Sequence, residues 1–173
     1  LDISESTVVR FATSLGYEGY PQMQKALKEI VRHRLTSAQR FEISVDMAPE
    51  DTVKAVLNTD MRNIRTTLQQ LNEQVFMQVV ETISSSRSIY VLGLRSAAPL
   101  SAFFGYYLHY IFDDVRVVNA INNDVFEIIS RIGPEDTLIA ISFPRYSSRT
   151  LESMRFANSR GAKVVALTDG PLS

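Results

Sequence analysis

Short runs of β-branched and other apolar residues alternate with helix-like segments from Arg87 to the end of the chain. This alternation constrains the fold more than any other feature of the sequence. Strands alternating with helices predict an α/β fold with a doubly wound parallel sheet. The expected strands are SIYVLG, VRVVNA, TLIAIS and AKVVALTD, and the expected helices are SAAPLSAFFGYYLHYIF, DVFEIISRI and SSRTLESMRFANSRG, the last closed by Gly161.

The chain before Arg87 is predicted to be helical. ESTVVRFATSL has apolar residues at helical spacing, and Gly16 suits the position that ends a helix. A turn at GYEGYPQ leads to a second helix, expected over about residues 22–39, and FEISVDMAPED breaks the pattern as a linker. We therefore predict a partial all-helical module in 1–40, a linker and long helix in 41–78, and the sheet domain in 79–173. Both outer parts are expected to be incomplete in this sequence.

An apolar stripe marks the long helix. Its residues are spaced alternately by four and three, which is heptad spacing. Such a stripe can pair with a second chain or pack on its own domain, and one stripe can do both. The stripe consists of Leu57, Met61, Ile64, Leu68, Leu71 and Val75.

The composition excludes several kinds of site. The chain of 173 residues has no cysteine, so disulfides, thiolate catalysis and cysteine-type zinc sites are excluded. Its two histidines, His33 and His109, show no metal-binding spacing, and we expect neither metal nor cofactor. No signal peptide or membrane-spanning run is visible, which predicts a cytoplasmic protein without membrane contact. The net charge of −1 gives no general case for nucleic acid, although the first 40 residues carry a basic excess.

The first helix nevertheless has the character of a DNA-reading helix. Short hydroxyl side chains near its start and a cation one turn later suit base edges and phosphates. The run SESTVVRFATSLGYEGYPQMQKAL resembles the end of the N-terminal helix-turn-helix of RpiR-type transcriptional regulators. By that resemblance, residues 1–40 are the C-terminal part of a helix-turn-helix domain. Ser6, Thr7 and Arg10 then face operator DNA.

Two loops follow expected strands at the edge where parallel sheets bind ligands. The first, GLRSAAPL, delivers Ser96 and backbone N–H groups to a helix start that attracts phosphate. The second, SFPRYSSRT, begins with Ser142 and places Ser147 and Thr150 at the start of the next helix. These hydroxyls either cap that helix or donate to a bound oxyanion.

Two arginines of the second loop, Arg145 and Arg149, also allow two interpretations. They are either solvated surface side chains or donors of charge-assisted hydrogen bonds to an anion. A phosphate site requires both loops to converge, and sequence spacing alone does not show this.

From about Ile89 onward the chain resembles the SIS (sugar isomerase) domain, whose phosphosugar site uses a Gly-x-x-Ser turn and a later Ser-rich loop. The resemblance assigns phosphosugar contacts to Ser96, Ser142 and Ser147. The second loop departs from the family pattern, because Phe143, Pro144 and Arg145 replace its usual polar residue, second serine and glycine. Tyr146 stands where SIS isomerases often have glutamate.

The two resemblances together imply a transcriptional regulator of carbohydrate metabolism with a sugar phosphate as effector. Its effector site is expected to comprise Ser96, Ser142, Arg145, Ser147 and Thr150, and the chain to form a homodimer or higher homo-oligomer. No catalytic residue is expected, since the second loop has no carboxylate to act as base.

Two alternatives remain open. One is a sugar-phosphate isomerase, for which Glu127 and His109 are the nearby candidate bases by sequence order. The other is an oligomerisation module whose phosphate loop has been spoiled by Phe143 and Pro144.

Overall fold

The computed structural model describes residues 5–24, 26–27, 49–119, 124–144 and 146–170. The chain divides into two compact units, residues 1–65 and 66–173, which are considered separately below. The expected second helix of the first unit lies mostly outside the described residues, although residues 20–24 are helical.

The first helix, α1 (Glu5–Ser14), ends as the sequence predicts. Gly16 adopts a left-handed backbone with φ of 87°. Its N–H donates to the Thr13 carbonyl, and the Tyr17 N–H donates to the Ala12 carbonyl. These two bonds form a Schellman motif, which satisfies carbonyls that the helix end leaves unpaired.

The prediction of one long helix is wrong in one respect, because the segment forms two helices. α4 spans Pro49–Gln70 and α5 spans Glu73–Ser84. Asn72 lies between them with an extended backbone, and its side-chain oxygen accepts a hydrogen bond from the Val75 N–H at 3.1 Å. This N-cap starts a new helix. The heptad stripe is therefore continuous only as far as Leu68.

The stripe is exposed along its whole length in the single chain. Ile64 is 69% exposed and Leu68 is 73% exposed, and the other stripe residues are also exposed. Within the described part of the chain, each of these side chains remains at least 48% exposed.

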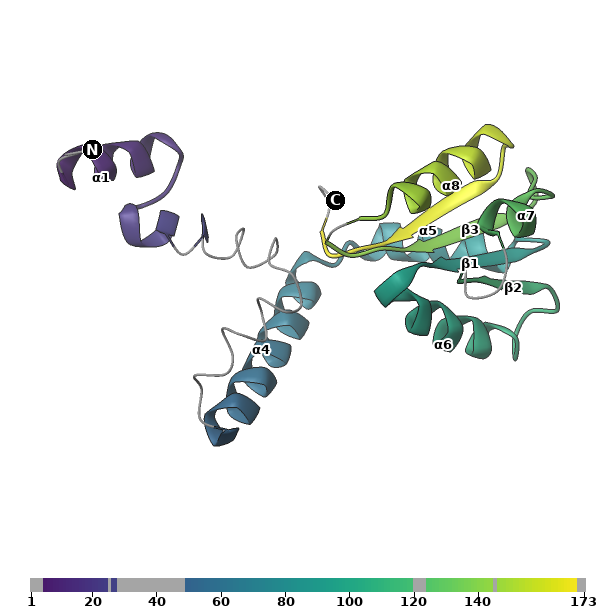
Figure 1. Cartoon of the computed structure of the whole chain (residues 1–173), viewed down its shortest axis with the longest axis horizontal. Helices are drawn as coiled ribbons and strands as arrows, with labels where there is room; N and C mark the ends of the chain where they lie inside the picture. Colours follow the sequence, from purple (N-terminus) through teal and green to yellow (C-terminus); the bar gives the residue numbers. More distant parts are fainter. Residues whose placement is uncertain (1–4, 25, 28–48, 120–123, 145, 171–173) are drawn as a thin grey trace. The chain divides into compact units, whose positions relative to one another are not determined.

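Four parallel strands form the sheet of the second unit, as expected (Figure 1). They are β1 (Ile89–Gly93), β2 (Val115–Val118), β3 (Thr137–Ile141) and β4 (Lys163–Leu167), in the order β2-β1-β3-β4. Every residue of β1 and β3 is buried, which explains their continuous apolar sequences.

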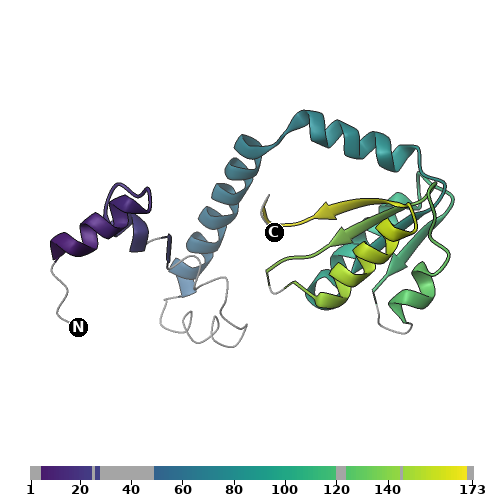
Figure 2. The same cartoon turned by 90° about the horizontal axis from the view of Figure 1, so that it is seen from above.

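Helices cover both faces of this sheet, so the doubly wound prediction is confirmed (Figures 1 and 2). Tyr90 and Leu92 of β1 pack on the side of α7 (Val125–Ile129) and α8 (Ser148–Ser159). The alternate residues Ile89 and Val91 pack on the side of α5 and α6 (Ala98–Leu108). Successive side chains of a strand point to opposite faces, and so one strand serves both cores.

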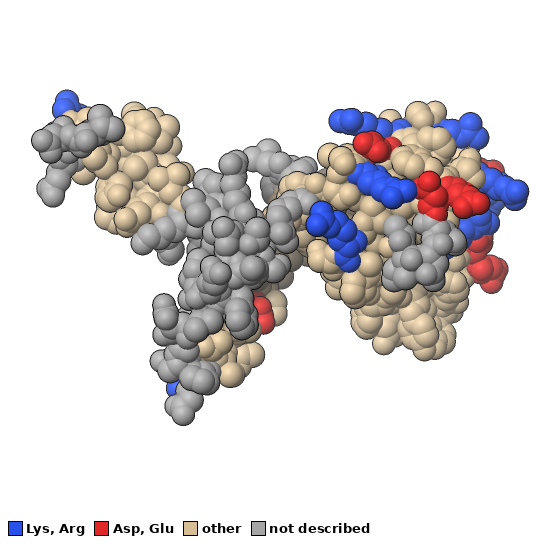
Figure 3. Space-filling model, in the orientation of Figure 1, with Lys and Arg blue, Asp and Glu red and all other residues tan. Residues whose placement is uncertain are grey.

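The two helical layers differ at their outer surfaces. In the view of Figure 3, charged side chains gather over α7 and α8, whereas the surface over α6 is nearly free of them. The exposed residues of α6 include Phe103, Tyr106 and Tyr107.

An ion pair with one buried partner lies at the amino-terminal edge of the sheet. The fully buried Asp136 carboxylate accepts two hydrogen bonds from the Arg87 guanidinium, at 3.0 and 2.9 Å, and a third from the Gly133 N–H. This bidentate geometry is the strong form of a carboxylate–arginine pair. It lies at the edge opposite the loops that follow β1 and β3. None of the helices in the described part of the chain is long and apolar enough to cross a membrane.

Candidate functional site

The strand order brings the two predicted ligand loops together. β1 and β3 are neighbours in the centre of the sheet. The chain leaves β1 toward α6 on one face and leaves β3 toward α8 on the other. Chains that diverge in this way leave a crevice beyond the carboxyl ends of the strands, where open α/β sheets bind ligands.

One cavity of about 230 Å³ lies in this crevice, and both loops line it. Its wall includes four of the five residues expected to bind an effector: Ser96, Ser142, Ser147 and Thr150. The fifth, Arg145, lies outside the described residues. The convergence that sequence spacing left open is therefore present for the hydroxyl residues.

The four hydroxyls make no side-chain hydrogen bond within the part of the chain that the structure describes. Thr150 is only 2% exposed. Ser147 occupies the N-cap position of α8, yet its hydroxyl does not bond to the helix. The first N–H groups of an α-helix have no partner within the helix. The cavity therefore combines hydroxyl groups with the positive end of the α8 dipole, an arrangement suited to an anion.

The first loop is a tight turn that depends on glycine. A Cβ atom added at Gly93 would lie 2.4 Å from the Ala97 carbonyl oxygen and 2.7 Å from the Ser101 Cβ. A short 3-10 helix, η1 (Arg95–Ala97), follows directly. Arg95 has φ of 57° and is the one non-glycine residue with positive φ among the described residues. This conformation costs roughly 1–2 kcal/mol for an ordinary side chain.

The second loop is tied to the end of β4. The Ser142 N–H donates to the Leu167 carbonyl at 3.1 Å, and the Tyr146 hydroxyl donates to the Asp169 carboxylate. Phe143 and Pro144 form part of the cavity wall, but the cavity remains open beside them. Tyr146 is thus bonded to the loop that follows β4.

A second cavity of about 700 Å³ adjoins the first and shares Leu94, Arg95 and Ser147 with it. Arg149 lines this second cavity and pairs with Asp124 at 2.6 Å. The Phe126 backbone N–H and then the Arg149 guanidinium hold the pKa of Asp124 below its usual value. Arg149 is consequently part of an ion pair, which neither sequence interpretation anticipated.

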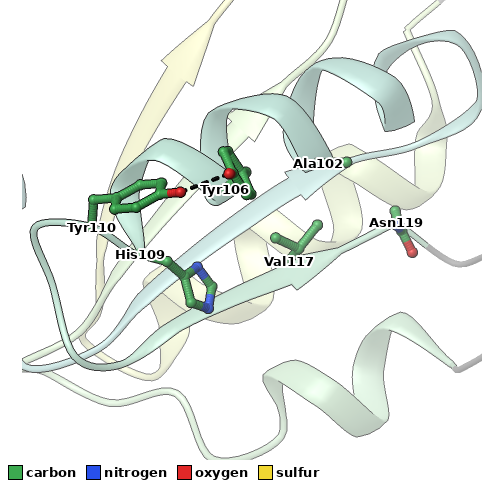
Figure 4. A pocket seen from close by; sticks show the side chains of 6 residues that line it. All are labelled: Ala102, Tyr106, His109, Tyr110, Val117 and Asn119. Atoms are coloured by element: carbon green, nitrogen blue, oxygen red, sulfur yellow. Dashed lines mark hydrogen bonds between the residues drawn. The ribbon is translucent and has the colours of Figure 1, made fainter.

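The two candidate bases lie elsewhere. His109 belongs to a shallow hollow beside Tyr106 of α6 and Tyr110, which follows the end of that helix, with Val117 and Asn119 opposite (Figure 4). One of its ring nitrogens, Nδ1, lies 2.8 Å from the Gly105 carbonyl. Glu127 is exposed on α7 and lines neither crevice cavity. Among the described residues, no cluster of histidine, aspartate and glutamate has a geometry suited to a metal ion.

The residues expected to face DNA are on the surface of α1. Ser6, Thr7 and Arg10 are all exposed. The Arg10 Nε donates to the Ser6 carbonyl at 3.4 Å, so both belong to the same side of the helix. Ala12, in contrast, is fully buried.

Comparison with known proteins identifies the domain. Residues 82–173 match the SIS domain family. A helix-turn-helix-type transcriptional regulator of Haemophilus influenzae, described as uncharacterized, is 23% identical over 172 residues, which are 97% of this chain and 59% of that protein. The chain therefore spans less than two thirds of the length of that curated relative.

Solved structures agree on the fold. The sugar isomerase domain of an RpiR transcription factor from Sphaerobacter thermophilus has a TM-score of 0.65 and 26% identity, over 69% of this chain and 66% of that one. Vibrio vulnificus NanR, complexed with ManNAc-6P, has a TM-score of 0.53 and 20% identity, over 95% and 56%. Phosphoheptose isomerase GmhA from Neisseria gonorrhoeae has a TM-score of 0.59 and 21% identity, over 70% and 75%.

Proposed function

The chain belongs to the SIS domain family, and we propose that it is part of a DNA-binding transcriptional regulator of carbohydrate metabolism. In this proposal a sugar phosphate binds at the carboxyl ends of β1 and β3 and acts as the effector. Its phosphate is held by Ser96, Ser142, Ser147 and Thr150, together with the first N–H groups of α8. Arg145 belongs to the proposed site as a further cation.

The observation that carries the proposal is the cavity itself. Hydroxyl side chains from both loops line one cavity, and none of them makes a side-chain hydrogen bond within the described residues. A phosphate oxyanion can accept hydrogen bonds from hydroxyl groups and from unpaired amides at a helix start.

The relatives support the regulatory half of the proposal. The Haemophilus influenzae relative is a helix-turn-helix-type transcriptional regulator. The NanR structure contains a sugar phosphate, although its similarity to this chain establishes only the fold. We assign DNA contacts to Ser6, Thr7 and Arg10, and dimer formation to the exposed stripe of α4, because helix-turn-helix proteins bind two half-sites as dimers.

An effector controls such a protein only if its affinity differs between the DNA-competent and DNA-incompetent states. The stripe helix is the proposed coupling element, because α4 precedes the SIS domain and bears the proposed dimer contact. A change in dimer geometry would alter the spacing of the two recognition helices.

We propose binding without turnover. Proton transfer next to a carbonyl needs a base within reach of the substrate. Neither crevice cavity has aspartate, glutamate or histidine among its described lining residues. The second candidate function is that of a sugar-phosphate isomerase. The phosphoheptose isomerase GmhA has a similar fold. Turnover of hexose, pentose or heptose phosphates by the full-length protein would favour it.

Thermal unfolding of the full-length protein tests the proposal. A ligand that binds only the native state raises its stability. We expect at least one member of a sugar-phosphate panel to raise Tm, and we expect Ser142→Ala to reduce the shift. Ser130→Ala is the matched control, since its hydroxyl bonds to the Glu127 carbonyl on α7, outside the cavity. Binding to DNA selected from a random pool is measured with and without the stabilising ligand.

If no sugar phosphate raises Tm at millimolar concentration, and Ser142→Ala behaves as wild type, the sensor proposal is wrong. It would leave an oligomerisation module with a vestigial pocket.

A further inference from the structure

The first cavity is smaller than most small-molecule sites. Small-molecule sites usually measure about 300–1,000 Å³, whereas this cavity measures about 230 Å³. The adjoining cavity of about 700 Å³ shares three lining residues with it. A ligand whose phosphate occupies the first cavity can therefore extend into the second.

Arg95 lies where the two cavities meet. It lines both of them, and its backbone has the left-handed φ of 57°. The turn separates its neighbours: Leu94 is buried, and Ser96 belongs to the first cavity but not to the second. A long cationic side chain is thus held on a backbone conformation that glycine and asparagine adopt more readily.

The charges of the second cavity leave Arg95 uncompensated. Its described charged lining residues are Arg95 and Arg149. Arg149 is paired with Asp124. The Arg95 side chain has no ion pair or hydrogen bond within the described residues. One guanidinium therefore remains available to a ligand that extends from the first cavity into the second.

On the basis of the proposed function, we infer that Arg95 determines ligand specificity. It binds the end of the sugar that is remote from the phosphate, and it favours a sugar phosphate with a carboxylate at that end. A guanidinium forms two parallel hydrogen bonds with a carboxylate, a geometry that a hydroxyl or aldehyde group does not offer.

Two ligands with the same phosphate test the inference. 6-Phosphogluconate carries a carboxylate at C1, where glucose 6-phosphate carries a hemiacetal. Calorimetric titration of the full-length protein is expected to show about tenfold tighter binding of 6-phosphogluconate. Arg95→Asn, which tolerates the left-handed backbone, should reduce this preference to about twofold or less. Arg95→Lys should keep part of it, because lysine retains the charge but not the bidentate geometry.

Inorganic phosphate and a surface variant serve as controls. Arg95→Asn should bind inorganic phosphate as wild type does, which also shows that the first cavity is intact. Arg155→Gln removes an exposed arginine of α8 that lines neither cavity, and it should leave the preference unchanged.

Three results would overturn the inference. They are equal or weaker binding of 6-phosphogluconate by wild type, a preference that survives in Arg95→Asn, and a loss of inorganic phosphate binding in that variant. The last would place Arg95 at the phosphate. Failure of all three ligands to bind wild type would instead sink the proposed function, and this inference with it.

Discussion

The crevice at the strand ends and the stripe on α4 are both surfaces whose side chains lack partners, but they differ in chemistry and shape. The crevice is concave, and its hydroxyl groups and Arg95 have no partner within the described residues. The stripe presents Ile64, Leu68 and other apolar side chains outward on a helix. Polar groups in a cavity suit a small polar ligand, whereas an apolar stripe at heptad spacing suits another helix. On this difference we propose ligand binding for the crevice and self-association for the stripe.

A charge in the stripe should have the largest effect. Leu68→Asp is expected to weaken dimerisation at least about a hundredfold, because an unpaired carboxylate would be buried between two helices. Sedimentation equilibrium measures this effect. Gln69→Asp adds the same charge on the next residue, off the stripe, and should dimerise as wild type does. An unchanged dimer in Leu68→Asp would show that the stripe is not the contact.

We expect Gly93→Ala to have the second-largest effect, and we expect it to change the shape of the crevice. The added Cβ would approach the Ala97 carbonyl to 2.4 Å, so the first loop must shift. We expect a loss of about 1–3 kcal/mol in the free energy of unfolding, together with weaker phosphate binding. Gly170→Ala is the control, since nothing lies within 4 Å of its added Cβ. Wild-type phosphate affinity in Gly93→Ala would mean that this loop does not shape the site.

Two N-caps, one from each region, separate capping from ligand binding. Asn72 bonds to the Val75 N–H, whereas the Ser147 hydroxyl makes no cap bond. Asn72→Ala should therefore cost about 1 kcal/mol of stability without changing phosphate affinity. Ser147→Ala should leave stability nearly unchanged and weaken phosphate binding by roughly three- to tenfold. Denaturant unfolding and calorimetry measure the two quantities. The reverse pattern at Ser147 would make it only a cap.

The smallest expected effect is a gain. Asp124 pairs with Arg149 and caps α7 through its bond to the Phe126 N–H. Asparagine caps a helix equally well, so Asp124→Asn releases Arg149 without removing the cap. We expect about two- to fourfold tighter binding of 6-phosphogluconate. The effect is small because breaking an exposed ion pair changes the free energy little. Glu127→Gln removes a charge from the same helix without touching Arg149. An equal gain in Glu127→Gln would indicate a general charge effect.

Much of the fold could be predicted because it depends on local patterns. The β-branched runs of β1 and β3 are continuous because both faces of these strands are buried. Gly16 and Gly161 both have the positive φ expected of residues that end helices. The break at Asn72 was missed, although asparagine followed by glutamate is a signal for a helix start. The heptad spacing masked it, because Leu71 and Val75 keep the spacing across the break.

The site was predictable only in part. Its serines are recognisable from their position after strands, but their convergence depends on the strand order. The pair of Arg149 with Asp124 joins residues 25 positions apart and depends on how α7 and α8 pack. The left-handed backbone of Arg95 has no signal in the residue itself, since arginine rarely adopts it. His109 and Glu127 were suggested by sequence order, which does not indicate position around a sheet.

Amide hydrogen exchange of the full-length protein tests the central claim most directly. It is measured with and without millimolar 6-phosphogluconate, glucose 6-phosphate or ManNAc-6P. The account predicts that a bound sugar phosphate slows exchange in residues 94–98 and 146–151, while any change at the stripe is secondary and disappears in Leu68→Asp. Protection that is absent from both loops but present elsewhere, with binding demonstrated, would contradict the assignment of the site.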